Sequence, residues 1–149
     1  MTMRSIETSI EIAAPLERVW AILSDLSAYH EWNPLIREAS GDLQPGGLAQ
    51  LFIATPGLAK RRVAVRVLAL DPLKEIRWLG RLLLPGVLDG DHRFVLSPLS
   101  AGRVRVVQQE AFRGLCVPFV ERWLLPKMTL GFQAMNEALR QRAEAPVPG

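Results

Sequence analysis

Few residues in this chain could form covalent or metal cross-links. The sequence of 149 residues contains one cysteine, Cys116. A single cysteine cannot form an internal disulfide, and it supplies no zinc-ligand cluster. It lies between Leu115 and Val117, an apolar setting that is typical of an inert small hydrophobic side chain rather than a nucleophile. These absences exclude a disulfide scaffold and a zinc finger, and we expect no metal site.

Long hydrophobic runs are also missing. No apolar run reaches the roughly 18 residues that a membrane-spanning helix needs. The most apolar stretch, Trp78 to Leu88, is interrupted by Arg81, Pro85 and Gly86. The segment from Met1 to Ile12 alternates polar and apolar residues and lacks the apolar block of a signal peptide. We therefore expect a soluble cytoplasmic domain with no membrane span.

Charge of one sign is not concentrated anywhere. The chain has 18 Lys and Arg against 15 Asp and Glu, and its only tight basic cluster is Lys60, Arg61 and Arg62. Nucleic-acid binding needs cations focused on one face, preferably with exposed aromatic side chains. The sequence also shows no Ser-His-Asp arrangement, phosphate-binding glycine loop or dinucleotide fingerprint. We expect neither a nucleic-acid partner nor a cofactor.

The chain has the length and composition of one globular domain. Its hydrophobic fraction is 49% and its charged fraction 22%. We expect a single domain over residues 1–149, with a frayed tail at 145–149. The first strand is predicted at 5–12, where Ile6, Ile10 and Ile12 share a face that Thr8 interrupts.

Two short helices are predicted next, followed by a run of strands. Pro15 precedes an apolar stripe that ends at Leu23, and Ser27 could cap a second helix through Trp32. Glycine and proline turns, among them Asp89-Gly90, then separate six further strands. These strands are predicted at 36–40, 48–54, 62–70, 75–83, 91–98 and 103–113. Short turns between successive strands imply antiparallel neighbours.

A long amphipathic helix is predicted from Pro126 to Glu144. Met128, Phe132, Met135 and Leu139 recur on one face of it. Pro126 should either kink this helix or begin it, with 119–125 as a separate helical turn or two. Seven strands and one long helix predict an α+β domain whose curved sheet wraps that helix. Such an arrangement leaves a space in which small molecules bind.

Several motifs in this order resemble the START-like superfamily, also called the birch-pollen-allergen-like or SRPBCC superfamily, with its helix-grip fold. The similarity is closest to its bacterial polyketide cyclase/dehydrase-like branch. The motifs are Ile12-Ala13-Ala14-Pro15 with Val19-Trp20, Tyr29-His30-Glu31-Trp32-Asn33-Pro34, Asp71-Pro72, His92-Arg93-Phe94, Glu110-Ala111-Phe112-Arg113-Gly114, and Phe132 to Leu139.

The resemblance implies a hydrophobic cavity between the sheet and the long helix. Family members bind lipids, sterols, polyketides or plant hormones, and some catalyse cyclisation or dehydration while others carry or sense a ligand. The motifs serve mainly the fold, so they do not select among these functions.

The strongest candidates for chemistry are Glu110 and His92. Glu110 shares a strand face with two valines and Phe112, which predicts that it points inward. It could act as an acid or base, or accept a hydrogen bond from a ligand. The alternative, which the pattern favours, is a structural carboxylate paired with an arginine or a backbone N–H. His92 is likewise either a catalyst or, as we favour, a hydrogen-bonded core residue.

Other inward-facing residues are candidates for the cavity wall, with plain core packing as the alternative. The ligand-binding set that we predict is Trp78, His92, Phe94, Gln108, Glu110, Phe112, Met128, Phe132 and Met135. Aromatic and methionine side chains suit this role because they bury large areas and adapt to a ligand's shape.

Three connections, 53–59, 84–88 and 115–119, are unusually apolar for loops. We expect them to meet at one cavity mouth, with Pro56, Leu84, Leu88, Leu115 and Phe119 as its residues. Such a mouth could admit a ligand, contact a membrane transiently or form a homodimer, or the loops could plug the opening.

Three functions remain open from the sequence. The favoured one is noncatalytic binding or transport of a hydrophobic small molecule. The others are a cyclase or dehydratase that uses Glu110 and His92, and a protein-interaction module that uses the apolar loops.

Overall fold

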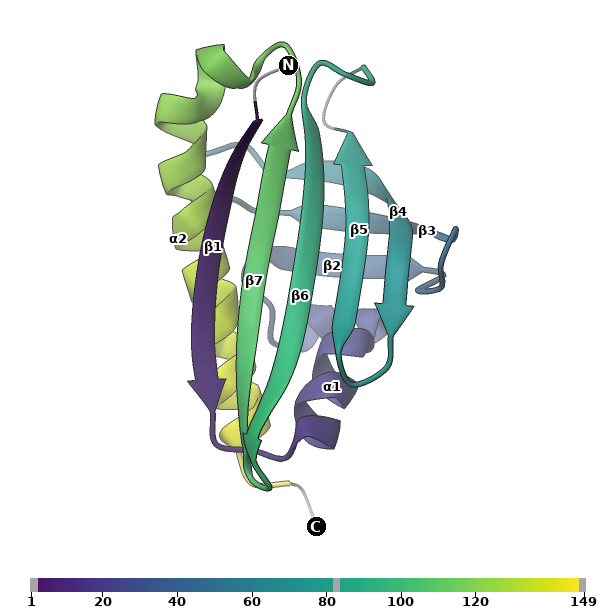
Figure 1. The fold of residues 1–149 in the computed structure, drawn as a ribbon, viewed down its shortest axis with the longest axis vertical. Helices are drawn as coiled ribbons and strands as arrows, with labels where there is room; N and C mark the ends of the chain where they lie inside the picture. Colours follow the sequence, from purple (N-terminus) through teal and green to yellow (C-terminus); the bar gives the residue numbers. More distant parts are fainter. Residues whose placement is uncertain (1–2, 82–83, 148–149) are drawn as a thin grey trace.

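The computed structural model describes residues 3–81 and 84–147 (Figure 1). The chain begins with strand β1 (Met3–Ile12), followed by helix α1 (Leu16–Ser24) and the short 3-10 helix η1 (Leu26–Glu31). Further strands follow before the long helix α2 (Val117–Glu144). These strands are β2 (Ile36–Gly41), β3 (Leu48–Ile53), β4 (Arg61–Asp71), β5 (Glu75–Arg81), β6 (Asp89–Ser100) and β7 (Arg103–Arg113).

The strands within the described residues form a seven-stranded antiparallel sheet in the order β1-β7-β6-β5-β4-β3-β2. Consecutive strands from β2 to β7 are neighbours because short turns join them. The sheet is strongly bent, so that β2 and β3 run behind and across the other strands while α2 lies along β1 (Figure 1). The predicted α+β helix-grip fold, with two short helices after the first strand, is confirmed.

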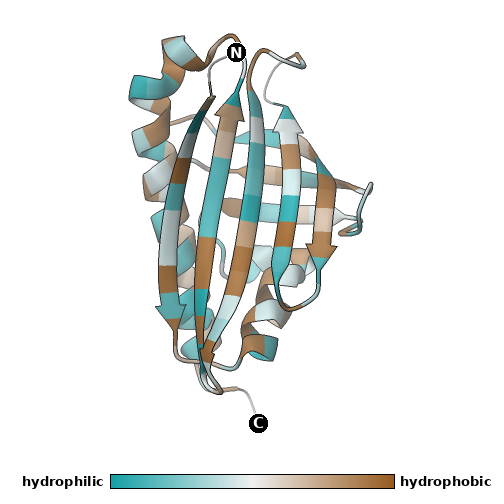
Figure 2. Ribbon diagram, viewed as in Figure 1, coloured by the Kyte–Doolittle hydropathy of each residue, from teal (hydrophilic) through white to brown (hydrophobic). Residues whose placement is uncertain are grey.

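Alternation of side chains sets the two faces of this sheet. Figure 2 shows mainly hydrophilic stretches in the upper halves of β6 and β7 and mainly hydrophobic stretches in their lower halves, so it is burial rather than hydropathy that alternates along these strands. On β7 the residues from Val104 to Phe112 are buried at every second position. The predicted strand at 75–83 ends at Arg81, and its last two residues, Leu82 and Leu83, lie outside the described residues.

One predicted turn is wrong. Asp89 and Gly90 begin β6, although an Asp-Gly pair is typical of turns. The reason is pairing on both sides: Gly90 lies opposite Gly80 of β5 and opposite Phe112 of β7. Hydrogen bonding to two neighbouring strands outweighs the weak local preference of this dipeptide.

Helix α2 is continuous from Val117, so of the two predicted effects of Pro126 the one in which it begins the helix, with a separate turn before, is wrong. A proline inside a helix removes one backbone hydrogen bond, yet packing on both sides of Pro126 holds the helix together. Leu124 is buried before the proline, and Phe132 and Met135 are buried after it. The predicted apolar face is therefore the packed face, and the helix begins nine residues, about two and a half turns, before the predicted start.

The end of α2 is held by α1. The Arg18 guanidinium donates hydrogen bonds to the carbonyl oxygens of Arg142, Ala143 and Ala145 at 3.1, 2.6 and 3.1 Å. The last carbonyls of a helix lack partners within it, and a cation there also suits the helix dipole. Among the described residues, no helix combines the length and apolarity needed to cross a membrane.

Candidate functional site

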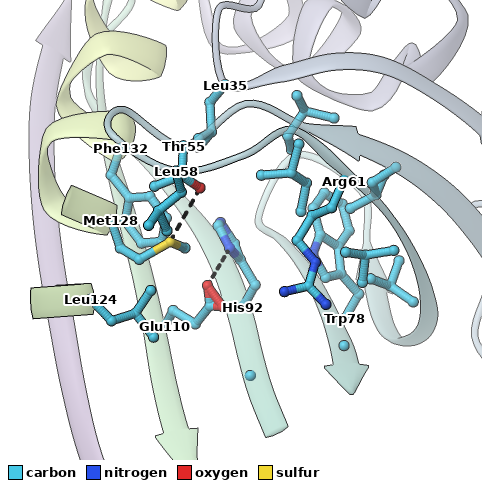
Figure 3. Close-up of a pocket in the computed structure, with 17 residues that line it drawn as sticks. Leu35, Thr55, Leu58, Arg61, Trp78, His92, Glu110, Leu124, Met128 and Phe132 are labelled. Atoms are coloured by element: carbon cyan, nitrogen blue, oxygen red, sulfur yellow. Dashed lines mark hydrogen bonds and ion pairs between the residues drawn. The ribbon is translucent and has the colours of Figure 1, made fainter. Parts of the chain in front are cut away.

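A pocket of about 80 Å³ lies between α2 and the inner face of the sheet (Figure 3). Most of its wall is aliphatic or aromatic. The sheet contributes Leu51, Ile53, Val63, Val65 and Trp78, and α2 contributes Leu124, Met128 and Phe132. Gly80 and Gly90 also line the pocket, and they have no side chain to extend into it.

Two buried polar side chains, His92 and Glu110, form the floor of the pocket. They are directly opposite each other on β6 and β7, and His92 Nδ1 lies 3.3 Å from Glu110 Oε1. Only 6% of His92 and 8% of Glu110 is exposed. With Glu110 ionised, this contact requires the hydrogen of a neutral imidazole to be on Nδ1, which leaves the lone pair on Nε2.

The Nε2 atom of His92 is a buried polar atom whose hydrogen-bonding capacity the described part of the fold does not use. It is buried, and among the described residues it has no hydrogen-bond partner. The ring cannot turn freely, because the rings of Trp78, Phe94 and Phe132 surround it at centroid distances of 5.5, 4.6 and 4.9 Å. A buried polar atom without a partner is costly, and at a pocket wall it is a place for a ligand's hydrogen-bond donor.

Two further polar residues line the pocket, and the sequence analysis did not select either. Thr55 is buried and donates from Oγ1 to the Met128 sulfur at 3.5 Å. Arg61 is exposed at the start of β4 and stands across the pocket from His92 (Figure 3). Its place in a short basic cluster was visible in the sequence, but the cluster gives no sign that one member faces a cavity.

Of the predicted ligand-binding residues, the structure brings Trp78, His92, Glu110, Met128 and Phe132 together around the pocket. The remaining four are buried elsewhere. Phe94 and Met135 belong to the main core beside the pocket, and Phe112 packs in a second, smaller cluster. Gln108 is fully buried and is used by the fold.

Gln108 takes part in a buried hydrogen-bond network between the sheet and α2. Its Nε2 donates to Asn136 Oδ1 at 2.8 Å, and Asn136 Nδ2 donates to Thr8 Oγ1, also at 2.8 Å. All three side chains are at most 9% exposed. Thr8, which weakened the apolar pattern of the first strand, is thus an inward-facing partner for a polar residue of α2.

None of the predicted mouth residues lines the pocket. Leu88 is buried against Phe112, Val117 and Leu124. Pro56 is close to α2, since a Cβ at Gly131 would lie 3.3 Å from its Cδ. The other three, Leu84, Leu115 and Phe119, are exposed to solvent.

Metal-binding residues are not grouped in the parts of the chain that the structure describes, where no cluster of three His, Cys, Asp or Glu could hold an ion. Asp91 lies beside His92 in sequence, but it points to the opposite face and pairs with Arg77 at 2.6 Å. Asp89 accepts a hydrogen bond from the Gly86 backbone at 3.2 Å.

Comparison with known sequences identifies one family. Residues 3–144 match the profile of the family described as polyketide cyclase / dehydrase and lipid transport. No curated protein matches the chain.

Solved structures share the fold at low sequence identity. The Zhui aromatase/cyclase from Streptomyces sp. R1128 superposes with a TM-score of 0.80 at 21% identity, covering 96% of this chain and 94% of that one. A START superfamily protein from Mycobacterium smegmatis gives 0.73 at 22% identity, covering 94% and 97%. Norcoclaurine synthase from Thalictrum flavum, in complex with dopamine and hydroxybenzaldehyde, gives 0.74 at 13% identity, covering 99% and 90%. At these identities the likeness establishes the fold alone.

Proposed function

The chain belongs to the polyketide cyclase/dehydrase and lipid transport family, and we propose that it binds a hydrophobic small molecule carrying one hydrogen-bond donor. The observation that carries this proposal is the unpartnered Nε2 of His92 in the wall of an otherwise apolar pocket. An apolar wall drives burial of the ligand, and a single polar atom fixes its orientation.

The size of the pocket restricts what can be enclosed. An apolar cavity of about 150 Å³ binds benzene, whereas this one is about 80 Å³. The enclosed space is therefore too small to surround a whole ring, so a ring bound there extends past the rim where Arg61 stands. The ring faces available for contact are those of Trp78 and Phe132.

The proposal is tested by calorimetric titration with p-cresol and p-xylene, which differ by a hydroxyl in place of a methyl. A hydrogen bond contributes about 1 kcal/mol, so the wild type should bind p-cresol about fivefold more tightly. His92→Phe should bind the two compounds equally. His30→Phe is the matched control, because His30 is exposed and remote from the pocket. Failure of the wild type to bind either compound would contradict the proposal.

A second candidate is acid–base catalysis, which the contact between His92 and Glu110 favours. A carboxylate that accepts from Nδ1–H orients the imidazole and stabilises the imidazolium that forms when Nε2 takes a proton. Such a base could remove a proton next to a carbonyl of a polyketide-like substrate and return it to a hydroxyl that departs as water. Dehydration needs both transfers, whereas an aldol cyclisation needs removal of the proton next to the carbonyl and return of a proton to the alkoxide that forms.

A general probe tests this second candidate without knowledge of the substrate. In 5-nitrobenzisoxazole, removal of the C3 proton by a base forms the nitrile as the N–O bond breaks, and the phenolate product absorbs visible light. The wild type should accelerate this reaction, and Glu110→Gln should lower the rate at least tenfold while binding p-xylene normally. Glu38→Gln, an exposed change, is the control. A wild-type rate equal to that of His92→Phe would rule out the base.

A further inference from the structure

Large apolar side chains are exposed at the end of the molecule where α2 begins. The exposed fractions are 81% for Phe119, 74% for Leu84, 71% for Leu115 and 48% for Trp123. These four residues are called the apolar tip below. Phe119 and Trp123 are four positions apart, so they share one face of α2.

The apolar tip is assembled from two connections that are hydrogen-bonded to each other. The backbone N–H groups of Leu115 and Cys116 donate to the carbonyl oxygens of Gly86 and Val87 at 3.1 and 2.9 Å. The β5–β6 connection therefore lies beside the first turn of α2. In Figure 2, hydrophobic segments of both connections meet at the upper end of the molecule.

Cations flank the apolar tip. Arg113 precedes Leu115, Arg122 lies between Phe119 and Trp123 in sequence, and both are exposed. Lys127 Nζ lies 5.7 Å from the centre of the Trp123 ring. Arg81 precedes the β5–β6 connection. Within residues 3–81 and 84–147, none of these four cations forms an ion pair with an acidic side chain.

Positive charge exceeds negative charge near the apolar tip, where Asp89 lies opposite Arg81 and Arg113 in the sheet. Residues 113–130 contain one acidic residue, Glu121, against three basic ones. Glu121 is paired with Arg4 at 2.8 Å. The surface is thus apolar at its centre and net positive around it.

We propose that the apolar tip docks on the surface of an anionic lipid bilayer. Leucine, phenylalanine and tryptophan side chains are suited to the boundary between headgroups and acyl chains, and the flanking cations would face lipid phosphates. Each Lys or Arg close to an anionic surface strengthens binding about fivefold. A second copy of this chain is a poorer partner, because a twofold contact would bring the cations of both copies together.

The location of the apolar tip gives docking a consequence for the pocket. Leu124, the neighbour of Trp123, is buried, packs under the apolar tip with Val117, and also lines the pocket. A docked molecule would therefore hold its pocket within one side-chain layer of the lipid. Docking itself does not depend on which ligand the pocket binds.

Flotation with vesicles tests the proposal. Full-length protein is mixed with vesicles of phosphatidylcholine alone, or of phosphatidylcholine and phosphatidylglycerol at three to one, in low and high salt. We expect binding to the anionic vesicles in low salt, at least fivefold weaker binding in high salt, and still weaker binding to the neutral vesicles.

Two variants separate the apolar and the charged contributions. Phe119→Ser should weaken binding at least fivefold, whereas Leu99→Ser, an exposed change near the end of β6, should not. Arg122→Glu should weaken it similarly, in contrast to Lys74→Glu in the β4–β5 turn. Both test positions are exposed, and thermal melting checks that the variants fold.

Three results would overturn the proposal. One is a wild type that does not float with anionic vesicles, and another is equal loss of binding in Leu99→Ser and Phe119→Ser. The third is a wild-type dimer that does not bind vesicles and that Phe119→Ser converts to a monomer, since the apolar tip would then be a contact between copies.

Discussion

Gly80 and Gly90 lie directly opposite each other on β5 and β6, and both line the pocket. Their neighbours along the inner face, Trp78 and His92, form the next facing pair. A flat strip of backbone therefore adjoins two planar side chains. The missing side chain of Gly90 leaves room for the Glu110 carboxylate, and that of Gly80 leaves room beside Val65 at the pocket wall.

Gly80→Ala should narrow the pocket without disturbing the dyad of His92 and Glu110. The new Cβ would lie 3.3 Å from a methyl of Val65, a tight contact that a small side-chain shift can relieve. We expect p-cresol affinity to fall about tenfold in calorimetry, while the free energy of unfolding changes by less than about 1 kcal/mol. Gly102→Ala, where the new Cβ meets no atom within 4 Å, is the control. Unchanged affinity would show that the ligand does not lie on this strip.

Gly90→Ala should act on the dyad instead. A Cβ at this position would lie 2.6 Å from Glu110 Oε2, so the carboxylate has to move away from His92. We expect the preference for p-cresol over p-xylene to disappear and stability in urea to fall by about 1–3 kcal/mol. A variant that keeps the full preference would mean that His92 orients a ligand without help from Glu110.

The order of strands and helices could be predicted from the sequence because it depends on local periodicity. Alternating valines marked β4 and β7, and the spacing of Phe132, Met135 and Leu139 marked the packed face of α2. The start of α2 was missed because the effect of Pro126 depends on packing around it. That packing is not a local property of the sequence.

Only part of the pocket could be predicted, because the rest of it also depends on packing between distant parts of the chain. Strand period placed His92 and Glu110 on the inner face, but nothing local says that two glycines face each other across β5 and β6. Local sequence patterns also give no sign that Asn136 lies within hydrogen-bonding reach of Thr8, 128 residues earlier in the chain. Cavities and buried networks arise where elements distant in sequence meet, so their positions depend on register and crossing geometry.

Asn136→Leu should strongly destabilise the fold. It would remove the partner of the buried Thr8 hydroxyl and leave the Gln108 amide nitrogen with one longer contact, 3.4 Å to the Phe132 carbonyl oxygen. A buried polar group without a partner costs about 1–3 kcal/mol, so we expect a loss of about 2–4 kcal/mol in urea denaturation. The double change Gln108→Leu with Asn136→Leu should cost less than the sum of the two single changes. Strict additivity would indicate that the three side chains are not coupled.

Glu11 should make stability depend on pH in the acid range. Hydrogen bonds from Arg105 and Arg103 hold the pKa of its carboxyl below the usual value of 4.5. A lowered pKa in the folded state stabilises the fold above pH 4.5, and this contribution is lost as the pH falls through the folded-state pKa. The stability difference between wild type and Glu11→Gln should therefore shrink as the pH is lowered from 6 to 3. A difference that stays constant would contradict the role of this pair.

Arg18→Met should release the end of α2 while keeping most of the side-chain volume. The guanidinium makes hydrogen bonds to three carbonyl oxygens at the end of the helix, and the methionine cannot replace them. We expect a loss of about 1–2 kcal/mol in the free energy of unfolding and faster amide hydrogen exchange in the last turn of α2. Arg66→Met, an exposed change on β4, should alter neither. If exchange in the last turn were unchanged, the end of the helix would be held by its own backbone and by packing of Leu139 and Ala143 rather than by α1.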